Sequence, residues 1–389
     1  MGFKILTLNN ISRKGLERLP RDRYQVASEI VHPDAILVRS ADMHSMKIPD
    51  SVRAVGRAGA GTNNIPVAGL SQRGIPVFTA PGANANAVKE LVLAGILLAA
   101  RHICESWQFV RGLKGDGAAL EAAVEQGKKR FVGHELPGRT LGVIGLGAIG
   151  VEVANAAHLL GMHVLGYDLQ ITVQRAWQLS SGVEQALSLD DLFSRSDVVT
   201  VHVPLTDTTR SLVNAQRIRL MRNGAILLNF ARAAIVNEAD ALAALDSGEL
   251  AAYVCDFPTP QCKDHPGVIA LPHLGASTSE AEENSAMMVA DTLRDYLENG
   301  NIRHSVNFPE AALPRLPATA RIAIANSNVP NMVGQISTCL ADAGLNIADL
   351  LNKSKGEVAY TLIDIDGRVP AGLIERIAAI QGVLSARVI

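Results

Sequence analysis

The chain has 389 residues, of which 48% are hydrophobic, and Lys plus Arg (36) nearly balance Asp plus Glu (38). This length exceeds what one ordinary core supports, so we expect two or three domains. The balanced charge excludes the strongly basic surface of proteins that bind nucleic acid or anionic membranes. Any anion is therefore expected to bind in a local pocket.

Three features of the sequence favour a reduced, cytoplasmic protein. The first residues lack the apolar core of a secretory signal peptide, and the longest apolar run, 91–100, is too short to span a bilayer. The cysteines at 104, 255, 262 and 339 form no C-x-x-C pair, so we expect free thiols.

The first eighty residues alternate short apolar runs with polar stretches, which is typical of parallel strands joined by helices. A long apolar helix and then a polar stretch are expected to follow. The predicted elements are strands at 4–8, 35–39, 54–57 and 76–79, a helix at about 87–104, and a polar stretch at 112–129.

From residue 139 onward, strands and helices alternate regularly, which predicts a doubly wound parallel sheet. Because crossovers between parallel strands are right-handed, few other topologies are compatible with this order. We expect strands at 140–144, 163–167, 198–203, 225–229, 252–255 and 268–271, and helices at 149–160, 189–194, 214–221 and 238–245.

Residues 306–320 contain Pro309, Pro314 and Pro317, and this segment is predicted to be a linker. The remaining residues follow the order strand, helix, strand, strand, helix, strand, which predicts a ferredoxin-like sandwich. Its strands are expected at 322–325, 347–352, 358–365 and 383–388, and its helices at 332–343 and 373–379.

The most specific motif, G-L-G-A-I-G at 145–150, follows a predicted strand and opens a predicted helix. In such a motif Gly145 permits the tight turn, Gly147 lets the backbone approach a pyrophosphate, and Gly150 lets the helix pack on the strand. Asp168 ends the next strand, where a carboxylate binds the ribose hydroxyls and repels a 2′-phosphate. The sequence therefore predicts a site for NAD rather than NADP.

Three further segments, 201–204, 229–232 and 271–275, follow predicted strands, at the edge where open α/β sheets bind ligands. Hydride transfer from a 2-hydroxy acid needs a base for the hydroxyl proton and a cation for the carboxylate. His273 and Arg232 are the candidates for these two roles. No histidine pair has the spacing of a metal site, so no metal is predicted.

Taken together, these motifs resemble the D-isomer-specific 2-hydroxyacid dehydrogenase family. The resemblance implies an α/β fold, with a Rossmann-type cofactor domain at 86–274 inserted in a flavodoxin-like substrate domain at 1–85 and 275–305. The segments that carry it extend over nearly all of residues 1–310 and are 56–63, 131–136, 145–150, 197–204, 229–232 and 272–278.

The resemblance also implies roles for individual residues. Arg232 would bind the substrate and His273 would be the catalytic acid/base, with NAD as the cofactor. The residues expected to line the cofactor are Gly145, Gly147, Ala148, Ile149, Gly150, Asp168, Val203, Pro204, Ala231 and Asp256, with Ala60 nearby.

Two arginines at predicted strand ends, Arg39 and Arg57, favour a substrate with a phosphate or second anion. Matching arginines in the family contact the phosphate end of phosphoglycerate, and Ser40 and Gly59 would complete the substrate site. The expected reaction is NAD-dependent oxidation of 3-phosphoglycerate to 3-phosphohydroxypyruvate, which opens serine biosynthesis. The alternatives are a glyoxylate, hydroxypyruvate or other D-2-hydroxyacid reductase, and a non-catalytic NADH-sensing scaffold.

The chain departs from the family at one catalytic position. The family usually pairs its histidine with a glutamate a few residues after the aspartate that matches Asp256. Here that position holds Gln261, or Pro260 if one residue is deleted. Asp264 or Asp256 could replace the glutamate, and the sequence leaves that choice open.

The segments 326–333 and 344–348 carry a second resemblance, of residues 321–389 to an ACT domain, a βαββαβ module that senses amino acids. Asn326, Asn328 and Asn346 would bind the effector, which the resemblance implies to be serine, because an amide can donate to a carboxylate and accept from an ammonium group. ACT domains generally pair, so a homo-oligomer through this domain and the cofactor domain is expected. The alternative is a module that serves only in dimerisation.

Overall fold

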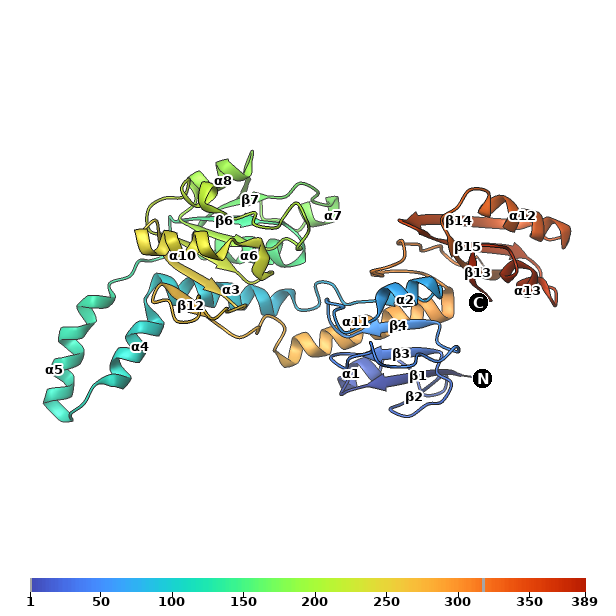
Figure 1. Cartoon of the computed structure of the whole chain (residues 1–389), viewed down its shortest axis with the longest axis horizontal. Coiled ribbons are helices and arrows are strands. Elements are labelled where there is room, and N and C mark those ends of the chain that lie inside the picture. The colour runs from blue at the N-terminus through green and yellow to red at the C-terminus, as the bar shows by residue number, and fades with distance from the viewer. Residues whose placement is uncertain (1, 317–318) are drawn as a thin grey trace. The chain divides into compact units, whose positions relative to one another are not determined.

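The computed structural model describes residues 2–316 and 319–389 (Figure 1). The chain divides into two compact units, one formed by Met1–Ala83 with Glu282–Ile389 and the other by Asn84–Ala281. The first unit holds a parallel sheet and a separate antiparallel sheet, and the second holds a larger parallel sheet.

The first unit begins with a five-stranded parallel sheet in the order β2-β1-β3-β4-β5. Four of its strands were predicted. The fifth, β2, is a four-residue edge strand, too short and too mixed in polarity to be recognised. The elements are β1 (Phe3–Leu8), α1 (Arg13–Leu16), β2 (Tyr24–Ala27), β3 (Ala35–Val38), β4 (Ala54–Arg57), α2 (Val67–Gln72), β5 (Val77–Phe78) and α11 (Ser279–Asn299).

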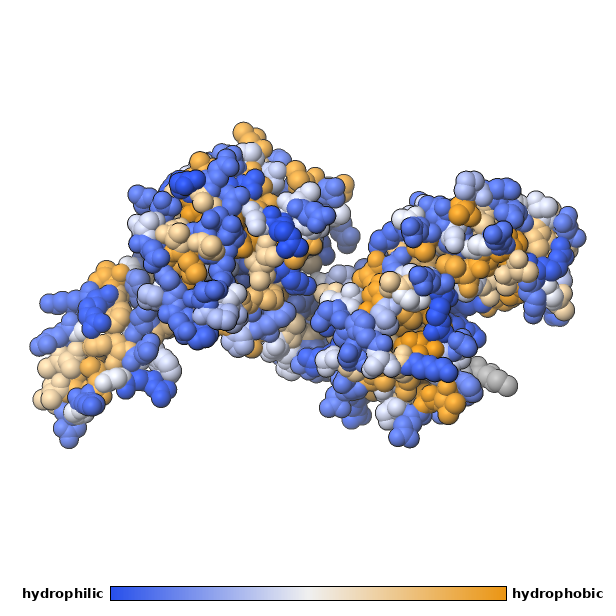
Figure 2. All heavy atoms as spheres, in the orientation of Figure 1, coloured by the Kyte–Doolittle hydropathy of each residue, from blue (hydrophilic) through white to orange (hydrophobic). Residues whose placement is uncertain are grey.

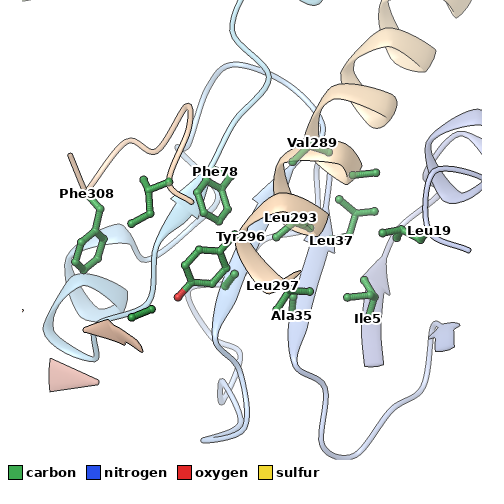
Figure 3. Close-up of a cluster of buried hydrophobic side chains, with 14 of the residues drawn as sticks. Ile5, Leu19, Ala35, Leu37, Phe78, Val289, Leu293, Tyr296, Leu297 and Phe308 are labelled. Atoms are coloured by element: carbon green, nitrogen blue, oxygen red, sulfur yellow. The ribbon is translucent and has the colours of Figure 1, made fainter. Parts of the chain in front are cut away.

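The 21-residue helix α11 covers one face of this sheet. Figure 3 shows Val289, Leu293 and Leu297 of α11 packed towards strand residues of the same core, and their exposed fractions are 1% or less. A Cβ on Gly56 of β4 would lie only 2.7 Å from the Leu293 side chain. The glycine therefore permits the helix to approach the sheet closely.

The C-terminal residues form a four-stranded antiparallel sheet in the order β14-β15-β13-β16, with the predicted strand and helix order. Asn331, before α12, adopts a left-handed backbone with φ of +67°, a conformation that Gly and Asn tolerate best. The elements are β13 (Thr319–Ser327), α12 (Met332–Asp342), β14 (Ile347–Lys355), β15 (Val358–Asp366), α13 (Leu373–Ala378) and β16 (Val383–Val388).

This antiparallel sheet packs against the C-terminal end of α11. Tyr360 donates a hydrogen bond to the Gly300 carbonyl (2.7 Å), and Arg387 donates to the Tyr296 carbonyl (2.5 Å). The fully buried Arg321 binds the Asn299 carbonyl (3.0 Å) and pairs with the fully buried Asp364. The Asn299 carbonyl belongs to the last turn of α11, where backbone carbonyls lack intrahelical partners, and Arg321 satisfies it.

The segment predicted as a linker, 306–320, contributes to the core of the same unit. Phe308, Ala311 and Leu313 are buried, and Ile302 and Ala311 form a β-bridge. Pro317 lies outside the described residues.

The second unit contains a seven-stranded parallel sheet in the order β12-β11-β10-β9-β6-β7-β8. Six strands were predicted, and the three-residue edge strand β8 was not. The elements are β6 (Thr140–Ile144), α6 (Ala148–Leu159), β7 (His163–Tyr167), α7 (Val173–Ala176), β8 (Val183–Gln185), α8 (Leu189–Arg195), β9 (Val198–Val201), α9 (Ala215–Ile218), β10 (Ala225–Asn229), η2 (Ala233–Ile235), α10 (Glu238–Ser247), β11 (Leu250–Cys255) and β12 (Val268–Ala270).

The prediction of a single helix at about 87–104 is wrong at the C-terminal end of that range. Helix α3 (Ala85–Ala100) ends where His102 adopts φ of +49°, and α4 (Ile103–Gly112) begins after it. The predicted polar stretch contains α5 (Gly117–Gly127), followed by η1 (Lys128–Phe131). Figure 1 shows α4 and α5 extending away from the sheet of this unit.

Helix α4 buries none of its residues, although it carries Trp107 and Val110, which are 61% and 49% exposed. Apolar residues lie exposed along α4 and α5 in Figure 2. Within the described part of the chain, no helix combines the length and apolar character that a membrane span requires.

Candidate active site

The glycine motif forms the turn between β6 and α6. Gly145 has φ of +93°, and a Cβ on Gly150 would lie 1.8 Å from the Gly145 carbonyl oxygen, so both positions require glycine. A Cβ on Gly147 would have no neighbour within 4 Å, so this residue faces open space. Gly147 caps α6 without a side-chain hydrogen bond, which leaves the first backbone N–H groups available to an anion. This cradle fits a pyrophosphate.

The other predicted residues of the loop surround this turn. Ala148 and Ile149 form the first turn of α6. Val203 follows β9 and borders the glycine turn, since a Cβ on Gly145 would lie 2.8 Å from its Cγ1 atom. The next residue, Pro204, is exposed.

Asp168 holds the glycine loop from the end of β7. Its Oδ2 atom accepts a hydrogen bond from the Leu146 N–H (2.7 Å), and Oδ1 accepts one from the Gln170 N–H (2.7 Å). Each carboxylate oxygen retains a lone pair for a further donor. Asp168 is partly exposed and can therefore also receive ribose hydroxyls, as NAD binding requires.

Arg232 is exposed on a turn that follows β10. The fully buried Asn229 braces this turn, since its Oδ1 accepts from the Ala231 N–H (3.1 Å) and its Nδ2 donates to the Arg232 carbonyl (3.0 Å). Asn229 had no predicted role, although a polar residue that ends a strand of otherwise apolar residues is a signal in the sequence. The Asn229 side chain therefore positions the backbone of Arg232.

His273 and Asp256 follow β12 and β11 at the same edge of the parallel sheet as Arg232. The His273 ring is exposed and lies 4.7 Å from the Phe257 ring, centroid to centroid. Asp256 is only 1% exposed, and neither carboxylate oxygen has a hydrogen-bond partner among the described residues. Burial raises the pKa of Asp256 to about 6, while the positive charges of His273 and Arg232 oppose this shift.

The position of the missing glutamate carries no carboxylate in the structure either. Pro260 and Gln261 are exposed, and Asp264 is exposed and paired with Lys263. Asp256 is instead the buried carboxylate that interacts with His273. A buried carboxylate without a partner destabilises the fold, so its presence indicates a ligand or a catalytic use.

We expect the Asp256→Asn variant to be more stable than the wild type at pH 8 by on the order of 2 kcal/mol. The folded-state pKa of about 6 exceeds the ordinary value of 3.8 for an aspartate, so ionisation destabilises the folded state as the pH rises through this interval. The advantage should therefore shrink below pH 6. Thermal unfolding of both proteins at pH 5 and pH 8 measures this difference in stability. If the midpoint of Asp256→Asn at pH 8 were equal to or lower than that of the wild type, the assignment would be contradicted.

In the first unit, the structure brings together Arg39, Arg57 and the loop of Gly59. The Arg57 Nε donates to the Arg39 carbonyl (3.1 Å), and a Cβ on Gly59 would lie 3.0 Å from the Arg57 Nη1. Arg39 itself forms an ion pair with Glu282 of α11, which sequence analysis did not identify. Ser40 and Ala60 are the exposed residues that adjoin this cluster in sequence.

The three predicted effector residues are not close together within one chain. Asn326 is 1% exposed, and its buried Oδ1 has no partner among the described residues. Asn328 donates to the Gly356 carbonyl (3.0 Å) at one end of β15, and Asn346 donates to Asp366 (2.7 Å) at the other. A nine-residue strand separates these ends by roughly 25 Å.

No cluster of three or more His, Cys, Asp or Glu that could hold a metal occurs among residues 2–316 and 319–389. All four cysteines are free thiols in the structure. Cys255 and Cys262 are buried with their sulfurs 4.0 Å apart, and burial raises the pKa of Cys255 to about 12, which disfavours its reactive thiolate form.

Residues 93–275 match the family model described as D-isomer specific 2-hydroxyacid dehydrogenase, NAD binding domain. A D-3-phosphoglycerate dehydrogenase from Haemophilus influenzae is 34% identical over 351 residues, covering 86% of this chain and 81% of that protein. The protein of the same name from Dictyostelium discoideum is 29% identical and is aligned over 100% of this chain and 97% of its own length.

Solved structures show the same fold. Apo D-mandelate dehydrogenase from Rhodotorula graminis covers 81% of this chain and 100% of its own, with a TM-score of 0.66 and 23% identity. The NAD+-bound 3-phosphoglycerate dehydrogenase from Entamoeba histolytica covers 79% of this chain and 99% of its own, with a TM-score of 0.59 and 23% identity.

Proposed function

Because the chain belongs to the D-isomer specific 2-hydroxyacid dehydrogenase family, we propose that it oxidises 3-phosphoglycerate to 3-phosphohydroxypyruvate, the first step of serine biosynthesis. It is an NAD-dependent oxidoreductase. The observation that carries the proposed reaction is the placement of Arg232, Asp256 and His273 at one edge of the seven-stranded sheet. The glycine cradle lies at this same edge, where open parallel sheets bind ligands.

Each of these side chains has a proposed role in the reaction. Arg232 holds the substrate carboxylate through charge-assisted hydrogen bonds and stabilises negative charge on the neighbouring oxygen. His273 takes the proton of the substrate hydroxyl as general base. Asp256 supports the protonated imidazole in place of the absent glutamate. When bound, NAD supplies the ring that accepts the hydride.

The proposed cofactor residues surround the cradle described above. Asp168 binds the ribose, and its negative charge disfavours a 2′-phosphate. The remaining contacts are proposed for Gly145, Gly147, Ala148, Ile149, Gly150, Val203, Pro204, Ala231 and Asp256, with Ala60 from the first unit. For the phosphate of the substrate we propose Arg39, Ser40, Arg57 and Gly59, since the Arg57 side chain lies against both the Arg39 backbone and the glycine loop.

Steady-state turnover tests the proposal against its alternatives. The chain should reduce NAD with 3-phosphoglycerate at a higher kcat/KM than it oxidises NADH with glyoxylate or hydroxypyruvate. The reverse preference would identify a reductase of the same family. Tight NADH binding without turnover of any of these compounds would identify a scaffold.

For the C-terminal residues 321–389 we propose an ACT domain that binds serine through Asn326, Asn328 and Asn346. The order of its strands and helices supports the module. Because Asn328 and Asn346 lie at opposite ends of the sheet, a shared effector site would take one residue from each of two copies. Sedimentation with and without serine tests this, and a monomer indifferent to serine would contradict it.

The proposed homo-oligomer has a second contact in the cofactor domain. The exposed Trp107 and Val110 on α4 favour this surface, since large apolar patches on soluble proteins are usually covered. We retain the proposed boundaries, with the substrate domain at 1–85 and 275–305, the cofactor domain at 86–274, and at 306–320 a linker that packs on the first unit through Phe308, Ala311 and Leu313. The free cysteines favour the proposed cytoplasmic location.

A further inference from the structure

The proposed phosphate site contains a negative charge. The Glu282 carboxylate lies 2.5 Å from the Arg39 guanidinium, Oε1 to Nη2, although the two residues are 243 positions apart in the sequence. The two side chains are 42% and 39% exposed, so both are accessible to a small anion. The family resemblance gave no role to Glu282.

The surroundings of Arg39 are those of an anion site. Arg57 binds the Arg39 backbone carbonyl through Nε, and its Nη1 lies within 3.3 Å of the Cβ positions that Gly59 and Gly61 lack. The buried Asn64 donates to the carbonyls of Arg39 and Ala41, at 3.2 and 2.7 Å. The strand end that carries Arg39 is therefore held firmly, with the Arg57 side chain bound to its backbone and the Glu282 carboxylate bound to its guanidinium.

Glu282 occupies a fixed place because α11 is fixed. Val289 and Leu293, further along this helix, are fully buried against the sheet (Figure 3). The neighbouring Glu283 pairs with Lys14 of α1 at 2.6 Å, which also ties this end of the helix to the unit. The Glu282 carboxylate can leave Arg39 only by rotating its side chain.

We propose that Glu282 is a specificity-determining residue that weakens binding of the substrate phosphate at this site. The proposal rests on the proposed function. Glu282 neutralises the positive charge of Arg39, its ion-pair partner, and it repels an incoming phosphate of charge about −2. Loose binding of the phosphate end favours release of a phosphorylated product.

The Glu282→Gln variant keeps a hydrogen-bond acceptor for Arg39 and removes only the charge. Charges several ångströms apart near a protein surface change a binding constant by about tenfold. We therefore expect the KM for 3-phosphoglycerate and the Kd for inorganic phosphate to fall by about fivefold to tenfold, with no rise in kcat. Raising NaCl from 0.05 to 0.5 M should shrink the difference, because salt screens exposed charges.

Glu283→Gln is the matched control, since it removes the same charge one residue along the helix, where Lys14 is its partner. This control should leave KM and the phosphate Kd within twofold of wild type. Equal phosphate affinity in Glu282→Gln and wild type, or weaker affinity in the variant, would overturn the proposal. Calorimetry with inorganic phosphate gives this result even if wild type fails to oxidise 3-phosphoglycerate, a failure that would count against the proposed function alone.

Discussion

Replacing His273 with asparagine should lower kcat by about 10²-fold to 10⁴-fold, the usual contribution of a positioned general base. Asparagine is similar in size but cannot take the hydroxyl proton. The affinity for NADH should stay within a few-fold of wild type, because the glycine cradle and Asp168 are unchanged. Steady-state turnover with 3-phosphoglycerate and fluorescence titration of NADH measure the two quantities.

His265→Asn is the control for this variant. His265 belongs to the same unit and is bound to the exposed Asp246 (3.2 Å), in the segment between β11 and β12. The control should retain turnover within about twofold. If His273→Asn also retained turnover, another group would be the acid/base, and the geometry around Asp256 would need another explanation.

The second large effect is expected at Arg321, and it concerns stability. Arg321→Met should destabilise the first unit by about 3–5 kcal/mol, because it leaves the carboxylate of Asp364 buried without its partner. Arg321 also donates to the carbonyls of Asn299, Leu313 and Pro314 at 3.0, 2.8 and 3.0 Å, and these bonds are lost as well. Thermal unfolding should show a midpoint lower by about 10 °C.

Two comparisons separate this effect from a general loss of charge. Arg13→Ala breaks an exposed pair with Glu17 and should change the free energy of unfolding by less than about 0.5 kcal/mol. The double variant Arg321→Met with Asp364→Leu should recover part of the loss, because no buried charge remains. A change below 1 kcal/mol in Arg321→Met would show that the ion pair does not anchor the C-terminal sheet.

Local sequence signals were sufficient where a pattern extended over many residues. The alternation from residue 139 onward predicted six of the seven strands of the second unit, and the glycine motif was placed correctly between a strand and a helix. The errors lie where the local signal is weak. The edge strands β2 and β8 are short and partly polar, and the helix break at His102 depends on a left-handed residue that is not glycine.

The sequence by itself determined the cofactor motif and its place between a strand and a helix, because turn stereochemistry and strand periodicity act within a few neighbouring residues. The resemblance of longer motifs indicated the family and supported the candidates His273 and Arg232. Only the tertiary structure decided which carboxylates face which cations. The buried Asp256 beside His273, the pairing of Arg39 with Glu282, and the pairing of Arg321 with Asp364 join residues from separate segments. Such pairs form where packing brings distant segments together and removes water, and no local pattern encodes that proximity.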